Sequence, residues 1–292
     1  MSAKHPIIAI TGSSGAGSPV ITSAIQHVLC RLEARSVIVD GEGFHRYDRS
    51  EFPAEVEKAE QAGRSLSHFA PEANLLDMLE SLLREYGQKG QGMHRRYVHD
   101  AEDARETGCP EGTFTPWEAI PENSDFLIYE GLHGCFTSEQ VDICRHMDLS
   151  IGVVPIINLE WMQKIYRDTE LRGYSQEAVM HTVERRMADY VHYITPQFSR
   201  THVNFQRIPV VDTANPFEPQ PLPTLNESKL VMRFCRPKQM PYSMPELMNK
   251  IPGSFMSRAN TLVIPGSEFE LGLQLVLEPL MAELLSRRRM ET

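Results

Sequence analysis

Several features that would place the sequence in a special class are missing. Its five cysteines are odd in number and form no C-x-x-C pair, so we expect reduced, mostly buried thiols rather than a disulfide framework or a zinc site. The apolar run at 6–10 is too short for a secretory leader, and the run at 151–157 is far below the ~18 residues of a membrane span. We therefore expect a cytoplasmic protein with no membrane partner.

An excess of positive charge is also missing. The 292 residues include 29 Lys and Arg against 39 Asp and Glu, a formal net charge of -10. Because phosphate groups repel such a chain, general nucleic-acid binding is not expected, and an anionic ligand would need a local basic pocket. Hydrophobic residues are 41% and charged residues 23%, which excludes a disordered or fibrous protein. The sequence contains no internal repeat.

The first forty residues predict a strand, a glycine-rich turn, a helix and a second strand. Residues 7–10 are a continuous apolar run, typical of a strand buried on both faces of a parallel sheet. Apolar residues then recur at helical spacing from 20 to 29, and a second strand-like run follows at 36–39. This order is that of a βαβ unit.

The rest of the chain alternates strand-like and helix-like segments, which predicts an α/β protein. Further strands are expected at 126–129, 151–157, 208–211, 230–234 and 261–264. Helices are expected at about 72–86, 159–171, 175–191 and 267–288, the third of them capped by Ser175. Because the later strands follow one another closely, part of the sheet should be antiparallel. Residues 87–122 should be a long surface excursion, and the proline-rich stretch 215–226 a rigid connector.

Residues 12–17 read G-S-S-G-A-G and lie between the first strand and its helix. In that position glycines allow successive backbone N–H groups to bind phosphate oxygens, and the helix N-terminus adds partial positive charge. The spacing matches the first half of a phosphate-binding loop, not the G-x-G-x-x-G of dinucleotide folds. The second half departs, because Ser18 replaces the usual Lys and Pro19 the usual hydroxyl residue. The candidate phosphate-binding residues are Gly12, Ser13, Ser14, Gly15, Ala16, Gly17 and Ser18.

Carboxylates follow two of the expected strands. Glu130 ends the strand at 126–129, where an acid in phosphoryl-transfer enzymes reaches the metal ion. Glu42 follows the second strand, at the edge where parallel strands meet their ligand, and His45 and Arg49 come shortly after it. A carboxylate beside cations predicts a general base next to an anion clamp. A solvated loop is the alternative.

Two consecutive helices carry basic residues. Lys164, Arg167 and Asp168 are spaced i, i+3 and i+4 and should share one helical face. Arg172 ends that helix, and Arg186 lies on the next. The pattern predicts a lid, at about 159–191, that closes over phosphates. Ordinary salt bridges along a helix are the alternative.

Beyond these single signals, long blocks of the sequence resemble proteobacterial phosphoribulokinase, and the match runs from residue 4 to about 280. The blocks are 10–17 (ITGSSGAG), 43–46 (GFHR), 129–134 (YEGLHG), 158–161 (NLEW), 196–199 (PQFS), 204–207 (NFQR) and 211–217 (VDTANPF). They are far more specific than a phosphate-binding loop alone.

The resemblance implies an adenylate-kinase-like P-loop nucleoside-triphosphate-binding fold, with a mixed sheet and helices on both faces, in a single domain 1–292. It implies transfer of the γ-phosphoryl group of ATP, with Mg²⁺, to O1 of ribulose 5-phosphate for CO₂ fixation in the Calvin cycle. Carried onto this sequence, the base falls on Glu42 and the metal-site acids on Glu130 and Asp168. The other active-site positions are Lys164 and Arg167 in the lid, with His45, Arg49, Arg172 and Arg186 toward the sugar phosphate.

The resemblance also implies regulation and assembly. Arg31, Arg233 and Arg258 match the arginines that shape the effector site of the family, with elements of that site in the last third of the chain. In bacterial members NADH activates and AMP inhibits there, and these members form large homo-oligomers. The plant-type cysteine near the phosphate loop is absent, so thiol control is not expected.

Three positions depart from the family pattern. The family has Asp in place of Glu42, a hydroxyl residue in place of Pro19, and usually another in place of Val20. Because these changes fall at the chemistry, a fold-retaining binding protein with little turnover stays open as an alternative. A small-molecule kinase of the uridine-kinase type is a second alternative. The pattern Arg-Asp-x-x-x-Arg-Gly at 167–173 is shared with uridine kinase. The clamp of His45 and Arg49 favours a phosphorylated acceptor.

Overall fold

The elements follow the chain in the order strand, helix, strand that the first forty residues predict. The computed structural model describes residues 4–12, 18–171, 173, 175–218 and 220–291. The strands are β1 Ile7–Thr11, β2 Ser36–Asp40, β3 Met93–His94, β4 Glu118–Ala119, β5 Phe126–Gly131, β6 Leu149–Val153, β7 Val203–Pro209, β8 Ser228–Phe234, β9 Phe255–Arg258 and β10 Thr261–Pro265. The helices are α1 Ser18–Arg31, α2 Phe52–Gln61, α3 Leu76–Lys89, α4 Ala101–Thr107, α5 Ile157–Tyr166, α6 Gln176–Asp189, α7 Met244–Lys250 and α8 Phe269–Glu291.

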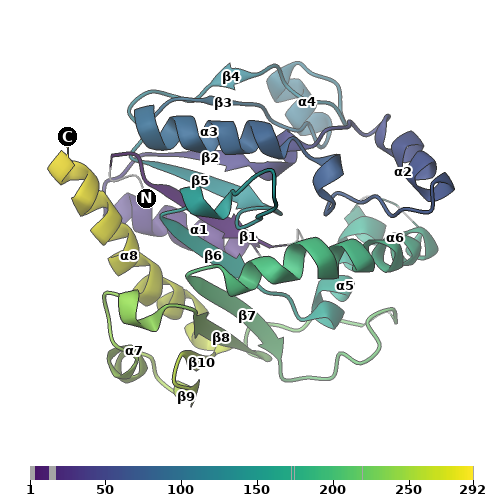
Figure 1. Ribbon diagram of the computed structural model, residues 1–292. Coiled ribbons are helices and arrows are strands. Elements are labelled where there is room, and N and C mark those ends of the chain that lie inside the picture. The colour runs from purple at the N-terminus through teal and green to yellow at the C-terminus, as the bar shows by residue number, and fades with distance from the viewer. Residues whose placement is uncertain (1–3, 13–17, 172, 174, 219, 292) are drawn as a thin grey trace.

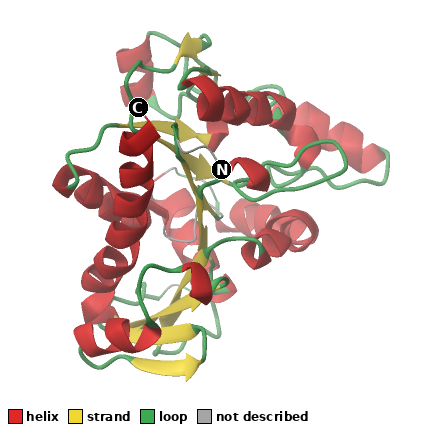
Figure 2. Cartoon of the chain, turned by 60° about the vertical axis from the view of Figure 1, so that its left-hand side comes forward, coloured by secondary structure: helices red, strands yellow, loops and turns green. Residues whose placement is uncertain are grey.

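Within the described residues, eight strands form one central sheet in the order β2-β5-β1-β6-β7-β8-β10-β9 (Figure 1). The five strands from β2 to β7 run parallel to their neighbours, whereas β8, β10 and β9 pair antiparallel. Helices cover both faces of the sheet, as the view along it shows (Figure 2). The expected α/β fold with a partly antiparallel sheet is confirmed.

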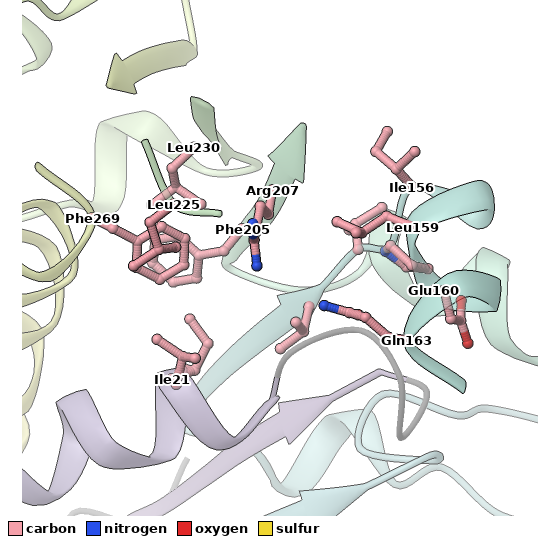
Figure 3. Close-up of a pocket in the computed structure, with 14 residues that line it drawn as sticks. Ile21, Ile156, Leu159, Glu160, Gln163, Phe205, Arg207, Leu225, Leu230 and Phe269 are labelled. Carbon is pink, nitrogen blue, oxygen red and sulfur yellow. The ribbon is translucent and has the colours of Figure 1, made fainter. Parts of the chain in front are cut away.

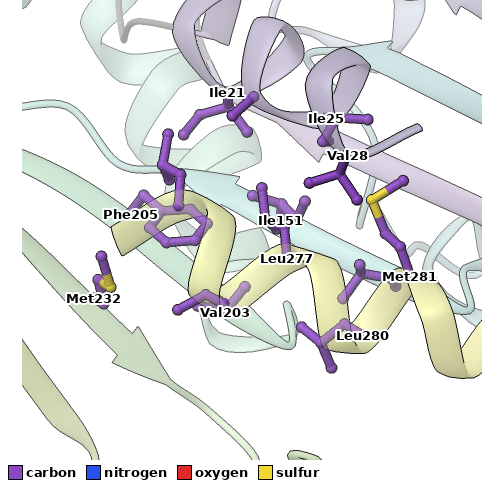
Figure 4. Close-up of a cluster of buried hydrophobic side chains, with 14 of the residues drawn as sticks. Ile21, Ile25, Val28, Ile151, Val203, Phe205, Met232, Leu277, Leu280 and Met281 are labelled. Atoms are coloured by element: carbon purple, nitrogen blue, oxygen red, sulfur yellow. The ribbon is translucent and has the colours of Figure 1, made fainter. Parts of the chain in front are cut away.

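The central strand β1 divides the core in two, because its side chains alternate between the faces. Ile8 and Ile10 pack in a cluster with α1 and α8, and Ile7 and Ala9 pack in a second cluster with α3. In the first cluster, α1 and α8 face one another across side chains of the sheet (Figure 4). The fully apolar sequence of β1 is therefore explained by burial on both faces.

Two of the expected strands have different bounds in the structure. The strand expected at 151–157 is β6 and ends at Val153, because Pro155 lacks the N–H that a central strand needs and α5 begins at Ile157. The strand expected at 208–211 is β7, which begins at Val203. Its polar residues alternate with apolar ones, so a search for a continuous apolar run missed its first half.

The expected helices are present with shifted ends, and others were missed. The expected lid helices are α5 and α6, each followed by a π-helical turn, at Arg167–Leu171 and Tyr190–Ile194. Ser175 caps α6 as predicted, since its Oγ accepts from the N–H of Ala178 at 3.2 Å. The unpredicted elements include α2, α4, α7 and β9. The excursion 87–122 contains α4 and the small sheet of β3 and β4. None of the described helices has the length and apolarity needed to cross a membrane.

Truncating the buried side chain of Leu277 should destabilise the fold strongly. Leu277 is 0% exposed in the cluster between α1, α8 and the sheet, so Leu277→Ala should lower the free energy of unfolding by about 2–5 kcal/mol. Met290 on the same helix is 76% exposed, and Met290→Ala should change it by less than about 0.5 kcal/mol. Urea denaturation of both variants tests this. Equal effects would show that α8 does not pack on the sheet in solution.

Candidate active site

The candidate site lies at the carboxyl ends of the parallel strands. Gly12 directly follows β1, and its N–H donates to the carbonyl of Gly131, the last residue of β5, at 3.3 Å. A Cβ at Gly12 would lie 2.6 Å from the carbonyl oxygen of Val153, so no larger residue fits there. Ser18 begins α1. The candidates Ser13, Ser14, Gly15, Ala16 and Gly17 lie outside the described residues. The strand and helix that flank a phosphate loop are therefore as expected.

Two glycines bring the segments after β2 and β5 into backbone contact. A Cβ on Gly41 would lie 3.0 Å from the Cα of Gly131, and one on Gly131 would lie 2.9 Å from the Cα of Gly41. The phenol oxygen of Tyr129 is 2.6 Å from either position, so neither glycine has room for a side chain. This contact fixes the spacing between the segment that carries Glu42 and the strand end that carries Glu130.

Glu42, the predicted base, lies in the 3-10 turn Gly41–Phe44 that follows β2. Its backbone N–H donates to Asp40 Oδ1 at 2.8 Å, and its Oε2 lies 3.5 Å from His99 Nε2. The side chain of Glu42 is about one third exposed, at 36%, so it is open to a substrate. Burial, and then the nearby charge of Glu42, raises the pKa of Asp40 to about 7. Because its side chain accepts the N–H of Glu42, Asp40 is the N-cap of the 3-10 turn.

Glu130, the predicted metal-site acid, is the last residue but one of β5. Its Oε2 accepts a hydrogen bond of 2.7 Å from the hydroxyl of Thr22 in the first turns of α1. This bond ties the carboxylate to the helix that follows the phosphate loop. One oxygen of Glu130 is thereby oriented at the edge where a metal–nucleotide complex would lie.

The predicted lid residues form one ion-paired cluster. Lys164 donates to Asp168 Oδ2, and Arg167 Nε donates to Asp168 Oδ1 at 3.0 Å. Burial acts to raise the pKa of Asp168, but the bonds from the two cations outweigh it and hold the pKa below its ordinary value. Burial, and then Arg186, lowers the pKa of Lys164. Asp168 therefore holds Lys164 and Arg167 together at the end of α5. This arrangement is compatible with a lid over phosphates and also with ordinary salt bridges.

A second basic group faces this cluster from α6. Arg186 is partly buried and lies over the ring of Phe69 at 5.7 Å, and the loss of solvent around its guanidinium, followed by the charge of Arg185, lowers its pKa to about 10. Among the described residues, the buried Nε atoms of Arg185 and Arg186 have no hydrogen-bond partner. Buried guanidinium donors without partners are suited to an anion. The clustering of Arg186 with the lid residues agrees with the sequence analysis.

His45 differs from the expected cationic clamp. Its ring stacks on His68 at 4.3 Å, and His68 in turn stacks on Phe52 at 4.0 Å. Burial, and then His133 and Arg186, lowers the pKa of His45 to about 3. In the free protein His45 is therefore neutral, and it can offer a hydrogen bond to an anion but no charge.

Arg49 contacts the excursion after α3. Its Nη2 donates to the carbonyl of His99 at 2.6 Å, and its guanidinium lies 5.9 Å from the centre of the Tyr97 ring. Because His99 also faces Glu42, the structure brings Arg49 close to the predicted base. Arg172 lies outside the described residues.

Arg95 was missed by the sequence analysis. Its Nε donates to the carbonyl of Gly43 at 2.8 Å and its Nη2 to the carbonyl of His45 at 2.7 Å. The guanidinium is held against Phe114 at 3.7 Å and Trp117 at 4.9 Å. Arg95 thus fixes the backbone of the turn that carries the predicted base. No motif pointed to it, because it lies in the irregular segment 87–122.

The three predicted effector-site arginines lie on two parts of the fold. Arg233 on β8 and Arg258 on β9 are both register neighbours of Thr261 on β10, so the two arginines share one row across the sheet. Arg31 ends α1, and its Nη2 lies 2.7 Å from Glu278 of α8. The structure therefore brings Arg233 and Arg258 together, while Arg31 is paired with α8.

A separate cavity of about 80 Å³ adjoins α1, the segment after β6, and β7 (Figure 3). Its lining is mostly apolar, with Glu160, Gln163 and Arg207 as the charged or amide groups. Ligand sites for drug-sized molecules have volumes of roughly 300–1,000 Å³, so this cavity is too small for a nucleoside triphosphate. We do not place a substrate there.

The comparisons with known proteins agree with this arrangement. The model of the "Phosphoribulokinase / Uridine kinase family" matches residues 7–214. The chain belongs to this family. It is 50% identical over 290 residues to the plasmid phosphoribulokinase of Cupriavidus necator, with 99% of each chain covered, and 48% identical over 291 residues to a probable phosphoribulokinase of Escherichia coli K12, with 100% of each covered. The solved phosphoribulokinase structure from "Rhodobacter spheroides" is 45% identical, with a TM-score of 0.89 over 99% of this chain and 100% of the other.

Family membership confirms the resemblance found in the sequence blocks and the expected P-loop kinase fold. The roles of individual side chains stay predictions. The structure assembles Glu42, the cluster around Asp168, and the basic groups Arg49 and Arg186 from segments that are far apart in the sequence.

Replacing Arg95 should lower the kcat for phosphoryl transfer, although Arg95 is not among the residues predicted to touch the substrate. Arg95→Lys keeps the charge but loses the paired bonds to the carbonyls of Gly43 and His45, so the turn should loosen and kcat should fall by roughly 10-fold or more. The neighbouring Arg96 pairs with exposed Glu106 at 3.2 Å, and Arg96→Lys is the matched control. Steady-state kinetics on both variants test this. Equal kcat values would remove the positioning role of Arg95.

Buried histidines should make the fold sensitive to acid. Burial lowers the pKa of His133 to about 4, and its Nε2 donates to the carbonyl of Phe69 at 2.9 Å. Because the unfolded chain takes up the proton near pH 6.5 and the folded chain near pH 4, stability should fall as the pH drops through this window. His133→Gln keeps a donor, so its loss of Tm between about pH 7.5 and pH 5 should be smaller by a few degrees.

His27 is the control for this experiment, because its side chain is 61% exposed on α1. His27→Gln should leave the pH dependence of Tm as in the parent protein. If His133→Gln shows the same pH dependence as the parent, His133 does not contribute to acid sensitivity.

Proposed function

We propose that the protein transfers the γ-phosphoryl group of ATP to O1 of ribulose 5-phosphate, giving ribulose 1,5-bisphosphate and ADP for CO₂ fixation in the Calvin cycle. The observation that carries the proposal is the likeness to the solved phosphoribulokinase over the whole chain, with a TM-score of 0.89. Named phosphoribulokinases at about 50% identity over full length support it. Phosphoryl transfer depends mostly on positioning and charge neutralisation, and the candidate site offers both.

The proposed base is Glu42. It is partly exposed, and its position after β2 is fixed by Asp40 and by the contact of the following turn with Arg95. Glu42 would accept the proton of the O1 hydroxyl as the oxygen attacks the γ-phosphorus. The proton then resides on the Glu42 carboxyl, within reach of the solvent.

The basic groups have two proposed tasks. Lys164 and Arg167, held by Asp168, would neutralise the charge of the migrating phosphoryl group, since an ordered cation pair costs little reorganisation at the moment of reaction. Arg49 and Arg186, with neutral His45 and with Arg172, would hold the phosphate of the acceptor. The unpartnered Nε of Arg186 supports this second task.

The nucleotide would bind at residues 12–18, between β1 and α1. Mg²⁺, held as usual by one or two carboxylates together with phosphate oxygens, would supply charge neutralisation between the β- and γ-phosphates. Glu130 fits this need, because it is an oriented oxygen donor beside the start of α1. Asp168 fits less well as a direct ligand, because both of its oxygens are already bonded to the lid cations.

Regulation and assembly are further parts of the proposal. Arg233 and Arg258 share a row on the antiparallel end of the sheet, which supports an anionic effector such as NADH there. We propose that Arg31 joins this site, that the protein forms homo-oligomers, and that it works in the cytoplasm. Of the alternatives, a uridine-kinase-like activity is favoured by the lid pattern alone, and a binding protein with little turnover by Pro19 and Glu42.

The deciding experiment measures ADP release by the purified protein with ATP, Mg²⁺ and a panel of acceptors. Ribulose 5-phosphate should be used well, and ribulose and uridine poorly, because the acceptor phosphate meets Arg49 and Arg186. Preference for uridine would support the uridine-kinase alternative. ATP binding without release of ADP for any acceptor would support the binding protein.

Asp168 should matter for turnover more than for substrate binding. Asp168→Asn keeps the shape but removes the charge that orders Lys164 and Arg167, so kcat should fall by about 10²-fold or more with modest change in KM. If Asp168 serves only a structural salt bridge, Tm should fall instead and kcat per folded molecule should be unchanged. Steady-state kinetics and thermal melting on the same samples separate the two results.

The departures from the family pattern should reduce activity. Glu42 is one methylene longer than Asp, and a misplacement of about 1 Å can cost on the order of 10²-fold in rate. Pro19, in the first turn of α1, brings neither a hydroxyl nor an N–H to the phosphate site. Glu42→Asp and Pro19→Ser should therefore each raise kcat/KM, and the double variant should raise it further. Glu42→Gln, which cannot accept the proton, is the control and should lose activity.

If either reversion leaves kcat/KM unchanged or lower, the surrounding backbone compensates for the departure at that position. The interpretation of that residue as a defect would then be wrong.

A further inference from the structure

Two cysteines that are nine residues apart in the sequence, Cys135 and Cys144, have their sulfur atoms in contact in the segment after β5. The Sγ atoms of Cys135 and Cys144 lie 3.1 Å apart and share a hydrogen bond, although the two thiols are not bonded covalently. Cys135 is buried in the turn after β5, and Cys144 begins the 3-10 turn Cys144–His146 and is partly exposed. A disulfide needs a sulfur–sulfur distance of about 2.05 Å, so the sulfurs would have to approach by only about 1 Å.

The backbone holds the two cysteines in this position. Residues 136 and 143, next to the two cysteines, are joined by a hydrogen bond of 3.0 Å from the N–H of Ile143 to the carbonyl of Phe136. One step further, the hydroxyl of Thr137 donates to Asp142 Oδ1 at 3.0 Å. The segment 135–144 is thus a closed turn whose two ends carry the sulfurs, and these bonds keep the two cysteines side by side.

The surroundings give the two thiols different reactivity. The hydrogen bond shared with Cys135, and then the charges of Arg200 and Arg236, lower the pKa of Cys144 against the opposing effect of burial. The bond to Cys144 and burial raise the pKa of Cys135. Cys144 is therefore the thiol that reacts first with an oxidant, and Cys135 is the partner that completes the pair.

We propose that Cys135 and Cys144 form a reversible dithiol–disulfide pair that is oxidised by peroxide. The Cys144 thiolate attacks a peroxide oxygen, the O–O bond breaks, and a sulfenic acid and one water are formed. The Cys135 sulfur then attacks the sulfenic sulfur, the S–O bond breaks, and a second water leaves. In total two thiols lose two protons and two electrons, and one hydrogen peroxide becomes two waters. A low-molecular-weight dithiol reverses the change by exchange.

This site is connected to the phosphate end of β1. The N–H of Cys135 donates to Gln197 Oε1 at 3.0 Å, and the hydroxyl of Thr11 approaches the same oxygen at 3.4 Å. The neighbouring Gly134 donates its N–H to Thr11 Oγ1 at 3.1 Å. Cys135 therefore lies on the segment that follows Glu130 and is joined through Gln197 to Thr11 at the end of β1.

The test uses the full chain, reduced, freed of reductant and treated with hydrogen peroxide in slight excess. After alkylation under denaturing conditions, intact-mass spectrometry should show three alkylated thiols instead of the five of the sequence, and loss of the mass of two hydrogen atoms. A digest with a protease that cuts after glutamate, and so at Glu139 between the two cysteines, should contain one peptide pair linked through Cys135 and Cys144. Dithiothreitol should restore all five thiols.

Variants separate this pair from the other cysteines. Cys30 is exposed on α1, and Cys30→Ser should form the disulfide as the parent does. Cys135→Ser should instead accumulate a sulfenic acid on Cys144 that a cyclic dione traps. Five alkylated thiols after peroxide treatment, oxidation at Cys30 or Cys109 alone, or cross-linked dimers in place of the internal pair would overturn the proposal.

Discussion

The structure depends on the burial of one strand, β1, between two parallel neighbours. Because β5 and β6 pair with it on either side, its carboxyl end is fixed relative to the ends of both. Gly12, the next residue, is held by its hydrogen bond to Gly131. The apolar clusters on both faces resist any shift of β1 along its axis, since a slip of one residue would exchange the faces of every side chain. The position of the proposed nucleotide site is thus set by core packing.

The amino-acid sequence predicted the fold where local signals and packing agree. The strand β1, with its apolar run, and the capped helix α6 have their cause within a few residues. The start of β7 was missed because Asn204 is buried there through tertiary partners: its Nδ2 donates to the carbonyl of Phe198 at 2.8 Å, and its Oδ1 accepts from the hydroxyl of Thr201 at 2.8 Å. The pattern of apolar and polar residues along the chain does not reveal the hydrogen-bond partners that allow Asn204 to be buried.

The candidate site shows the same division. The positions of Glu42, Glu130 and Asp168 could be predicted because each lies at a strand end or has a helical spacing to its partners, while their roles stay predictions. Arg95 could not, because its role comes from two carbonyls about fifty residues away and from aromatic neighbours in an irregular segment. The neutral state of His45 was equally beyond the sequence, since it results from burial against His68 and from the surrounding cations.

The contact of Gly41 with Gly131 holds the carboxyl ends of β2 and β5 at a fixed distance from one another. A second backbone cannot come closer, and an added methyl group would force the loops apart. The lengths of the acidic side chains are therefore what can vary between the proposed base, Glu42, and the proposed metal-site acid, Glu130. We therefore expect natural variants to exchange Asp and Glu at these acidic positions and to keep both glycines. The distance between the two strand ends would then stay constant while the length of the carboxylate side chain changes.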